Sequence, residues 1–412
     1  MASGGATWEE LLGSNEWKGL IDPLDLNLRK LILQCGDMCD ATYDAFIGDS
    51  NSKYCGAGRY GMKSFFKNVF LADCASKYQV VSFIYSTPID VPTNDSSFTV
   101  GSTLFYQTNW MGYIAVSNDE VSKANGRREI YVVWRGTILL TELIDDLNAN
   151  LVSALPFMGS QPVNLIPGSD AAGGAKVMEG WLSIYTADNP KSQFTKHSAQ
   201  TQILTKIKEL AEQYKGENLS LIFTGHSLGG VLAALSAYNV ADTSAVPSNV
   251  PVSAFVFCCP TLGNQVLCDK IKARKNLRIL HMKNVKDFLA TYPKSVFPWG
   301  DYAHPGIELE VDTSKSPHLN PSQNLISKDN RLNWHNLQGL LHVIAGWNGS
   351  NGEFKLNVKR SLALVNKSSG FLKDEYRIPK SWSVERNMRM AIDQNGEWVE
   401  KEPLQEEEQA TN

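Results

Sequence analysis

The hexapeptide Gly-His-Ser-Leu-Gly-Gly at residues 225–230 constrains the fold of this chain more than any other feature. It contains the pattern G-x-S-x-G and lies between a run of β-forming residues, 219–224, and a stretch of small apolar residues, 231–240. This setting predicts a sharp strand-to-helix turn, which the glycines permit because they lack a Cβ atom. Such a turn lifts the Ser227 hydroxyl above a sheet and places the amide N–H of Leu228 beside it. The alternative is a glycine-rich turn in which the serine only caps a helix.

Strands and helices alternate around this turn. The expected elements are, in chain order, helices within residues 1–50, strands within 77–116, a strand at 129–134, a helix at 203–214, the strand at 219–224, the helix at 231–240, a strand at 252–258, a helix at 266–273 and a strand at 277–282. Alternation at this spacing indicates βαβ units. We therefore predict an α/β fold with a mostly parallel central sheet flanked by helices.

The length of the chain fits one large α/β domain with additions, so we expect a single domain over residues 1–412. Residues 1–75 are expected to be an N-terminal helical and loop decoration. The stretch 150–176 is rich in proline and glycine and is predicted to be a lid or mobile loop, with a plain surface insertion as the alternative. The acidic residues within 402–412 are predicted to form a solvated tail.

Charge and cysteine usage narrow the class of protein. Lys and Arg number 39 and Asp and Glu 43, so no basic excess exists to bind a nucleic acid. The seven cysteines are odd in number, and Cys35 and Cys39 have no matching Cys or His pair at zinc-site spacing, which favours reduced thiols in a cytosolic protein. The N-terminal residues resemble neither a secretory signal nor a transit peptide, and no apolar stretch approaches the roughly 18–20 residues that cross a bilayer. A cytoplasmic protein is therefore expected.

A catalytic serine needs a base, and the base needs an orienting acid. In enzymes with this strand–serine–helix turn, both follow the serine in the chain. Asp287 stands five residues after the expected strand at 277–282, at the edge where parallel strands end. It is the favoured acid, with a helix-capping Asp as the alternative. Asp269 in an expected helix, and Asp301 and Asp312 in looser segments, are weaker candidates.

Five histidines follow the serine and compete for the role of base, namely His281, His304, His318, His335 and His342. His281 falls inside an expected strand and His342 lies two turns along an apolar helix, positions that are typical of packed core residues. His304 lies in a turn and His318 in a proline-rich stretch. His335 opens the apolar helical segment, where a histidine can face a site. The spacing favours His335 without excluding the others.

The loop after the strand at 129–134 offers a second donor, besides Leu228, for a developing oxyanion. Arg135, Gly136 and Thr137 follow this strand, and Thr137 carries both an amide N–H and a hydroxyl. The alternative is an ordinary strand-end turn with Arg135 on the surface.

Arg-Gly-Thr after a strand, followed by Gly-His-Ser-Leu-Gly-Gly, resembles the class 3 (fungal-type) lipases, and more closely the plant phospholipase A1 branch of that family. Other segments carry the same resemblance: residues 51–60 (NSKYCGAGRY), 110–116 (WMGYIAV), 126–130 (GRREI), 180–185 (GWLSIY), 260–264 (PTLGN) and 334–342 (WHNLQGLLH). It is expected to extend over nearly the whole chain and implies the α/β-hydrolase fold. Because its N-terminal residues do not resemble a transit peptide, the sequence resembles the cytosolic type II group of these enzymes.

The resemblance assigns roles to the matching residues. Ser227 matches the family nucleophile, Asp287 the acid of an Asn-x-x-Asp segment, and His335 the base of the Trp-His-Asn-Leu motif. Thr137 and Leu228 match the two oxyanion donors. The resemblance thereby selects His335 among the five histidines.

The activity that the resemblance implies is hydrolysis of the sn-1 acyl ester of a glycerophospholipid, without a metal or other cofactor. It implies a phospholipid or other acyl-lipid substrate and transient contact with a lipid surface, and it specifies no protein partner. One alternative is a lipase or acyltransferase acting on galactolipid or on mono-, di- or triacylglycerol. Another is a non-catalytic, lipase-like signalling protein, although the roughly 70 residues after His342 are few for the helical domain such proteins add. Relatives commonly carry Glu-Trp where this chain has Glu142-Leu143, a change expected to affect the acyl pocket or the lid contact.

Overall fold

A seven-stranded sheet runs through the computed structural model, which describes residues 5–87, 108–137, 149–158, 174–293, 301–320, 332–383 and 390–400. Its strands lie in the order β1 (Tyr78–Ser86), β2 (Asn109–Ser117), β3 (Arg128–Trp134), β6 (Leu219–His226), β7 (Val252–Phe257), β8 (Leu277–Asn284) and β9 (Ile307–Val311). The first three are antiparallel, and all neighbours from β3 to β9 are parallel. The predicted mostly parallel sheet is confirmed.

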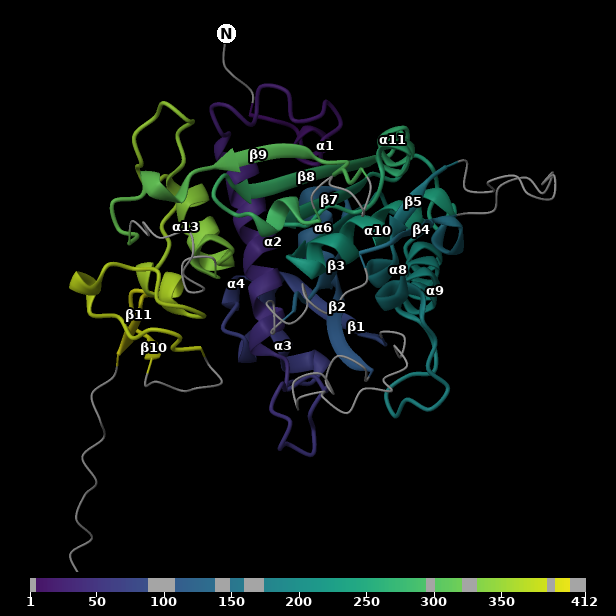
Figure 1. The fold of residues 1–412 in the computed structure, drawn as a ribbon, viewed down its shortest axis with the longest axis horizontal. Helices are drawn as coiled ribbons and strands as arrows, with labels where there is room; N and C mark the ends of the chain where they lie inside the picture. Colours follow the sequence, from purple (N-terminus) through teal and green to yellow (C-terminus); the bar gives the residue numbers. More distant parts are fainter. Residues whose placement is uncertain are drawn as a thin grey trace, which may run out of the picture.

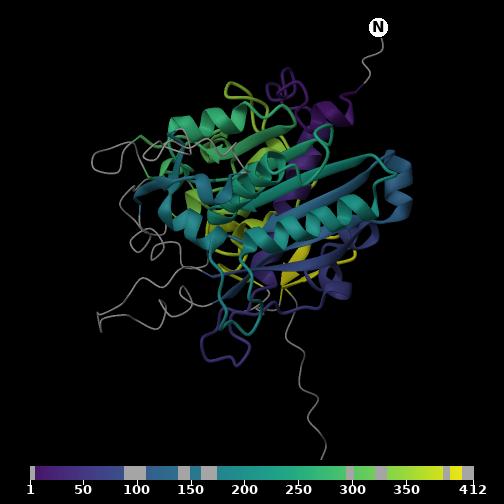
Figure 2. The same cartoon turned by 90° about the vertical axis from the view of Figure 1, so that its right-hand side faces the viewer.

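Both faces of this sheet are covered by helices (Figure 1). One face packs against α8 (Glu179–Thr186), α9 (Ala199–Gln213), α10 (Leu228–Asp242) and α11 (Gln265–Lys272), and the other against α2 (Leu26–Asp44), α3 (Phe65–Asn68), α4 (Ala72–Lys77) and α13 (Leu337–Gly346). Alternate side chains of a strand therefore serve two different cores: in β3, Val132 and Trp134 join the first, and Tyr131 and Val133 the second. Figure 2 turns the side with α8 and α9 toward the viewer.

Smaller elements complete the described part of the chain. They are α1 (Trp8–Leu11), η1 (Met62–Ser64), α6 (Asp119–Asn125), β4 (Leu151–Ser153), η2 (Leu155–Phe157), β5 (Lys176–Met178), η3 (Leu289–Thr291), η4 (Thr313–Lys315), η5 (Leu362–Asn366), η6 (Asp374–Tyr376), β10 (Met390–Ile392) and β11 (Trp398–Glu400). Among the described helices, none has the length and apolar character that a membrane crossing requires.

Part of the N-terminal region, residues 1–75, which was predicted to be a decoration, is packed against the central sheet. Helix α2 begins at a cap in which the Asp25 carboxylate accepts hydrogen bonds from two backbone N–H groups. Its buried residues Leu28, Ile32 and Met38 are part of the core beneath the sheet. Since a helix in this position cannot be removed without exposing a face of the sheet, α2 is an integral layer of the fold.

The stretch 150–176 is only partly described. Its ends, β4 and β5, form an antiparallel ladder, and Phe157 of η2 is fully buried in the first core. Residues 159–173 lie outside the described residues, as do Leu143 and the tail 402–412, so the predictions for them stay predictions.

Candidate active site

Ser227 is the single residue between β6 and α10, so the turn is tighter than the six-residue turn the sequence indicated. The β6–β7 ladder continues to His226, and α10 begins at Leu228. Ser227 takes φ 58° and ψ −128°, a backbone conformation that costs about 1–3 kcal/mol for a residue with a side chain. A Cβ on Gly225 would lie 2.0 Å from the carbonyl oxygen of Gly229, which explains the glycines of the motif.

The Ser227 hydroxyl is buried in this turn and has no hydrogen-bond partner among the described residues. A buried hydroxyl without a partner is costly, and such groups are concentrated where chemistry needs a free nucleophile or donor. Leu228 is the first residue of α10, and the first N–H groups of a helix lack intrahelical acceptors. The N-terminus of α10 thus offers an amide donor and a favourable dipole next to the serine.

Asp287 and His335 lie 48 residues apart in the chain and are joined by a hydrogen bond of 2.7 Å between Asp287 Oδ2 and His335 Nδ1. Both are about 3% exposed. Because a carboxylate oxygen only accepts, Nδ1 carries a proton, so the neutral tautomer of this ring has its lone pair on Nε2. Nε2 is buried without a partner among the described residues. This is the tautomer a general base requires.

The same carboxylate also accepts a hydrogen bond of 3.0 Å from the backbone N–H of Leu289, at the start of η3. Asp287 is not the N-cap of η3, which is Phe288 and makes no side-chain cap bond, so its bond to Leu289 only helps to hold the carboxylate that contacts His335. Asn284, the last residue of β8, strengthens the link: its side-chain Nδ2 donates to the carbonyl of Trp334, 3.1 Å away. The loop of the acid and the segment of the base are thus tied together at two points.

The other candidate histidines are packed elsewhere. The rings of His281 and His304 lie 4.1 Å apart, and those of His318 and His342 lie 5.5 Å apart. Of the five, His335 is the one that bonds to Asp287. The predictions that His281 and His342 are buried core residues are confirmed.

Residues 135–137 follow β3 at the same edge of the sheet as Ser227, because Trp134 pairs with Gly225 in the parallel ladder. The alternative of a surface Arg135 is wrong. Its buried guanidinium donates to the carbonyls of Trp110 and Gly136 and lies 3.8 Å from the centre of the Phe46 ring. A loop held this firmly can present the half-buried Thr137 as a donor, and its role remains a prediction.

Sequence reasoning missed two residues that contact this site. The hydroxyl of Tyr43 in α2 lies 2.7 Å from His226 Nδ1, and His226 Nε2 lies 2.9 Å from the backbone carbonyl oxygen of His335. His226 stood inside the motif without a role, whereas Tyr43 is 183 residues away and gave no local signal.

His226, Cys258 and His335 place potential metal-ligating atoms within 4.8 Å of one another. Hydrogen bonds already occupy both ring nitrogens of His226 and Nδ1 of His335. Burial raises the pKa of the Cys258 thiol well above its usual value, so the thiolate that a metal needs is disfavoured. The donor set therefore fits the hydrogen-bond network better than a metal ion.

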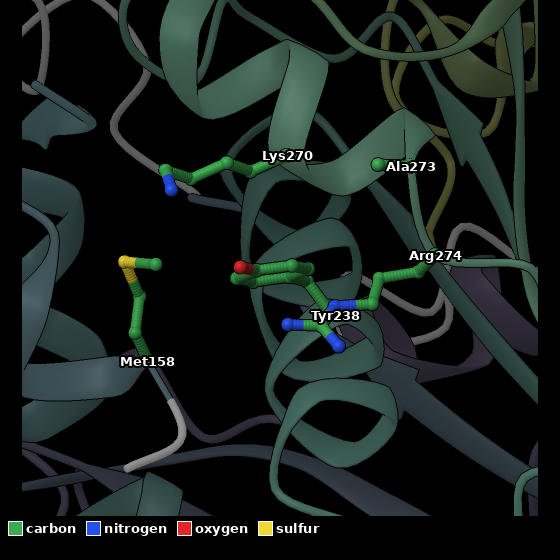
Figure 3. A pocket seen from close by; sticks show the side chains of 5 residues that line it. All are labelled: Met158, Tyr238, Lys270, Ala273 and Arg274. Atoms are coloured by element: carbon green, nitrogen blue, oxygen red, sulfur yellow. The ribbon is translucent and has the colours of Figure 1, made fainter. Parts of the chain in front are cut away.

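A pocket of about 190 Å³ lies between the end of η2, α10 and α11 (Figure 3). Figure 3 shows Tyr238 beside Arg274, with Lys270 and Met158 across the opening. Tyr238 stands ten residues beyond Leu228, which on a helix is about 15 Å. This pocket is therefore separate from the serine, and none of the predicted site residues lines it.

Comparisons with known proteins extend this description. The family model described as Lipase (class 3) matches residues 131–297. Phospholipase A1-IIdelta of Arabidopsis thaliana is 48% identical over 422 aligned residues, covering 98% of this chain and 100% of that protein. Phospholipase A1-II 5 of Oryza sativa subsp. japonica is 41% identical, covering 98% and 85%. A triacylglycerol lipase of Penicillium expansum is 18% identical, with a TM-score of 0.41, over 70% of this chain and 81% of that one.

Proposed function

Because this chain belongs to the class 3 lipase family, in its phospholipase A1-II group, we propose that it is a serine esterase that hydrolyses the sn-1 acyl ester of glycerophospholipids. The observation that carries the proposal is the 2.7 Å contact between Asp287 and His335, which leaves Nε2 of His335 for the hydroxyl of Ser227; both atoms are buried and have no partner in the part of the chain that the structure describes. Both unsatisfied groups are explained if they act on each other and on a substrate.

In the proposed reaction, His335 Nε2 takes the proton of the Ser227 hydroxyl while the serine oxygen attacks the ester carbonyl carbon. The amides of Leu228 and Thr137 stabilise the negative charge on the carbonyl oxygen. His335 then gives its proton to the glycerol oxygen, and the lysophospholipid leaves. Water attacks the acyl-enzyme and loses a proton to His335, which gives it to the serine oxygen as the bond to the acyl carbon breaks, so the fatty acid and the free serine hydroxyl are released. Asp287 keeps the Nδ1–H tautomer and stabilises the imidazolium.

The test is hydrolysis of a phosphatidylcholine with distinguishable acyl chains at sn-1 and sn-2, with galactolipid and mono-, di- and triacylglycerol in parallel. We expect release of the sn-1 chain by the wild type and a loss of at least about 10⁴-fold in Ser227→Ala. Ser220→Ala is the matched control, since Ser220 is a buried serine at the other end of β6 whose hydroxyl likewise has no partner within the described ranges. It should keep its activity.

The outcomes separate the alternatives. Release of the sn-2 chain would overturn the positional assignment. Activity confined to a galactolipid or a neutral lipid would keep the serine mechanism and overturn the substrate. A folded protein that hydrolyses none of these esters, and whose Ser227 does not react with a fluorophosphonate, would be a non-catalytic member of the family.

We further propose that the protein works in the cytoplasm, in transient contact with a lipid surface. The unpaired state of all seven cysteines supports a reducing compartment. A fluorescent fusion in plant cells should give diffuse cytoplasmic signal, and accumulation in chloroplasts or in the secretory pathway would contradict the proposal. Sedimentation with phospholipid vesicles tests the surface contact.

A further inference from the structure

The side chain of His226 lies between helix α2 and the segment of His335, which are far apart in the sequence. One ring nitrogen, Nδ1, is 2.7 Å from the hydroxyl of Tyr43 in α2. The other, Nε2, is 2.9 Å from the backbone carbonyl oxygen of His335. His226 also directly precedes Ser227 in the chain. The residue next to the nucleophile is therefore connected, through its own side chain, to the backbone of the base.

The direction of these two hydrogen bonds follows from their chemistry. A backbone carbonyl only accepts, so Nε2 of His226 must carry a proton. Burial lowers the pKa of His226 well below its usual value, so the ring is neutral and Nδ1 has no proton. The Tyr43 hydroxyl must then donate to Nδ1. The order is Tyr43 O–H to His226 Nδ1, and His226 Nε2–H to the carbonyl of His335, and the first bond selects the tautomer that makes the second possible.

The Tyr43 hydroxyl also lies against the loop of the predicted oxyanion donor. A Cβ on Gly136 would come within 2.1 Å of the Tyr43 hydroxyl oxygen and 2.6 Å of the backbone oxygen of His226. Phe46, three residues after Tyr43 in the chain, places its ring over the guanidinium of Arg135. The C-terminal end of α2 thus touches the turn of the serine and the loop of Thr137, and reaches the base through His226.

From this geometry we propose that Tyr43 and His226 are positioning residues that hold the backbone of His335 in register with Ser227. The proposal rests on the proposed function, because it assigns His335 and Ser227 their roles as base and nucleophile. The hydrogen bonds of the two positioning residues reach the base through its backbone, and the His226 ring also packs beside the His335 ring, with the ring centres 4.8 Å apart. Their effect is on distance and direction, to which proton transfer and attack are sensitive: a displacement of about 1 Å can lower a rate about 100-fold.

The experiment compares Tyr43→Phe, His226→Gln, His226→Leu and the double variant Tyr43→Phe/His226→Leu with the wild type. Tyr113→Phe is the matched control, because the buried hydroxyl of Tyr113 donates to the carbonyl of Met38 on the same helix α2 without contacting the site. The readouts are kcat and KM for phosphatidylcholine, the second-order rate of fluorophosphonate labelling of Ser227, and the NMR resonance of the His335 Nδ1 proton.

We expect Tyr43→Phe to lower kcat and the labelling rate about 10-fold, and His226→Leu about 100-fold, with little change in KM. His226→Gln should retain more activity than His226→Leu, because an amide can still donate to the His335 carbonyl. The double variant should be no slower than His226→Leu alone, since Tyr43 acts through His226. The Nδ1 proton resonance should shift in Tyr43→Phe and stay in place in Tyr113→Phe.

Other results overturn the inference. If the wild type hydrolyses phospholipid and labels at Ser227, but Tyr43→Phe matches Tyr113→Phe in every readout, Tyr43 has no positioning role. Additive losses in the double variant would mean that Tyr43 and His226 act independently. A folded wild type that neither hydrolyses the ester nor labels would overturn the proposed function, and this inference with it. Should His226→Leu fail to fold, Tyr43→Phe and His226→Gln still decide the question.

Discussion

The two halves of the candidate site are built in different ways. The nucleophile half, residues 225–230, is a continuous segment whose shape follows from its own glycines and from the strand and helix on either side. The base half, made of the loop of Asp287 and the segment of His335, joins residues 48 positions apart through side-chain hydrogen bonds. Its further link to the nucleophile half, through His226, involves a tyrosine 183 residues away.

This difference predicts which kind of substitution damages each half of the site. The continuous turn is fixed by close backbone contacts and has no room for an added atom. A single substitution there should therefore destabilise the fold and abolish activity together. A half assembled from separate hydrogen bonds should lose its geometry in steps, one bond at a time, while the protein stays folded. The following predictions test this contrast.

The largest effect should come from Asp287→Asn, which keeps the shape of the acid but removes its charge. The amide can donate to His335 Nδ1, so the ring takes the wrong tautomer, and kcat should fall by about 10³–10⁴-fold. The matched control is Asp269→Asn in α11, where the carboxylate accepts a hydrogen bond from Gln265 on the surface. Equal kinetics of the two variants would reject Asp287 as the acid.

The next effect concerns the nucleophile half. In Gly225→Ala the new Cβ meets the backbone oxygen of Gly229, and backbone cannot move aside as a flexible side chain can. We expect the free energy of unfolding to fall by about 3 kcal/mol in denaturant titrations, with activity lost in parallel. Gly216→Ala, whose Cβ would meet nothing within 4 Å, is the control. Normal stability of Gly225→Ala would show that the turn can relax.

A smaller and more selective loss should follow Asn284→Asp. The change removes the N–H that donates to the Trp334 carbonyl and places a carboxylate against it, so the base segment should shift. We expect kcat to fall about 10–30-fold, a cost of about 2 kcal/mol. Asn276 is the control: it precedes the same strand β8 and its side chain donates to the Val250 carbonyl at the opposite edge of the sheet. Equal kcat losses in Asn284→Asp and Asn276→Asp would contradict a specific role for this contact.

The smallest effect is on the pH dependence of stability in the base half. Burial lowers the pKa of His342 in α13 from its ordinary value of 6.5 to about 3. Between these two values the unfolded chain binds a proton that the folded chain does not, so folding stability falls as the pH falls. The contribution is about 1.4 kcal/mol per pH unit below pH 6.5. In His342→Gln, the slope of unfolding free energy against pH between 6.0 and 4.5 should be shallower by that amount. An unchanged slope would mean that His342 titrates in the folded state.

Much of the fold was predictable because its signals are local. The strand at 219–224, the serine turn and the helix after it differ from the structure only at their ends. The extension of β6 to His226 depends on pairing with Phe257, a partner in another strand that the local pattern does not reveal. Likewise, the burial of Arg135 depends on acceptors and a ring contributed by Trp110 and Phe46.

The sequence by itself determined the nucleophile half, since glycine backbone freedom and strand and helix preferences act within a few residues. It also supplied Asp287 and His335 as candidates, the latter from five histidines through a family resemblance. Only the tertiary structure decided that His335 bonds to Asp287, that the other four histidines pack elsewhere, and that Tyr43 reaches His226. The physical reason is that hydrogen bonds between distant segments depend on how helices and strands pack, and packing is a property of the whole chain.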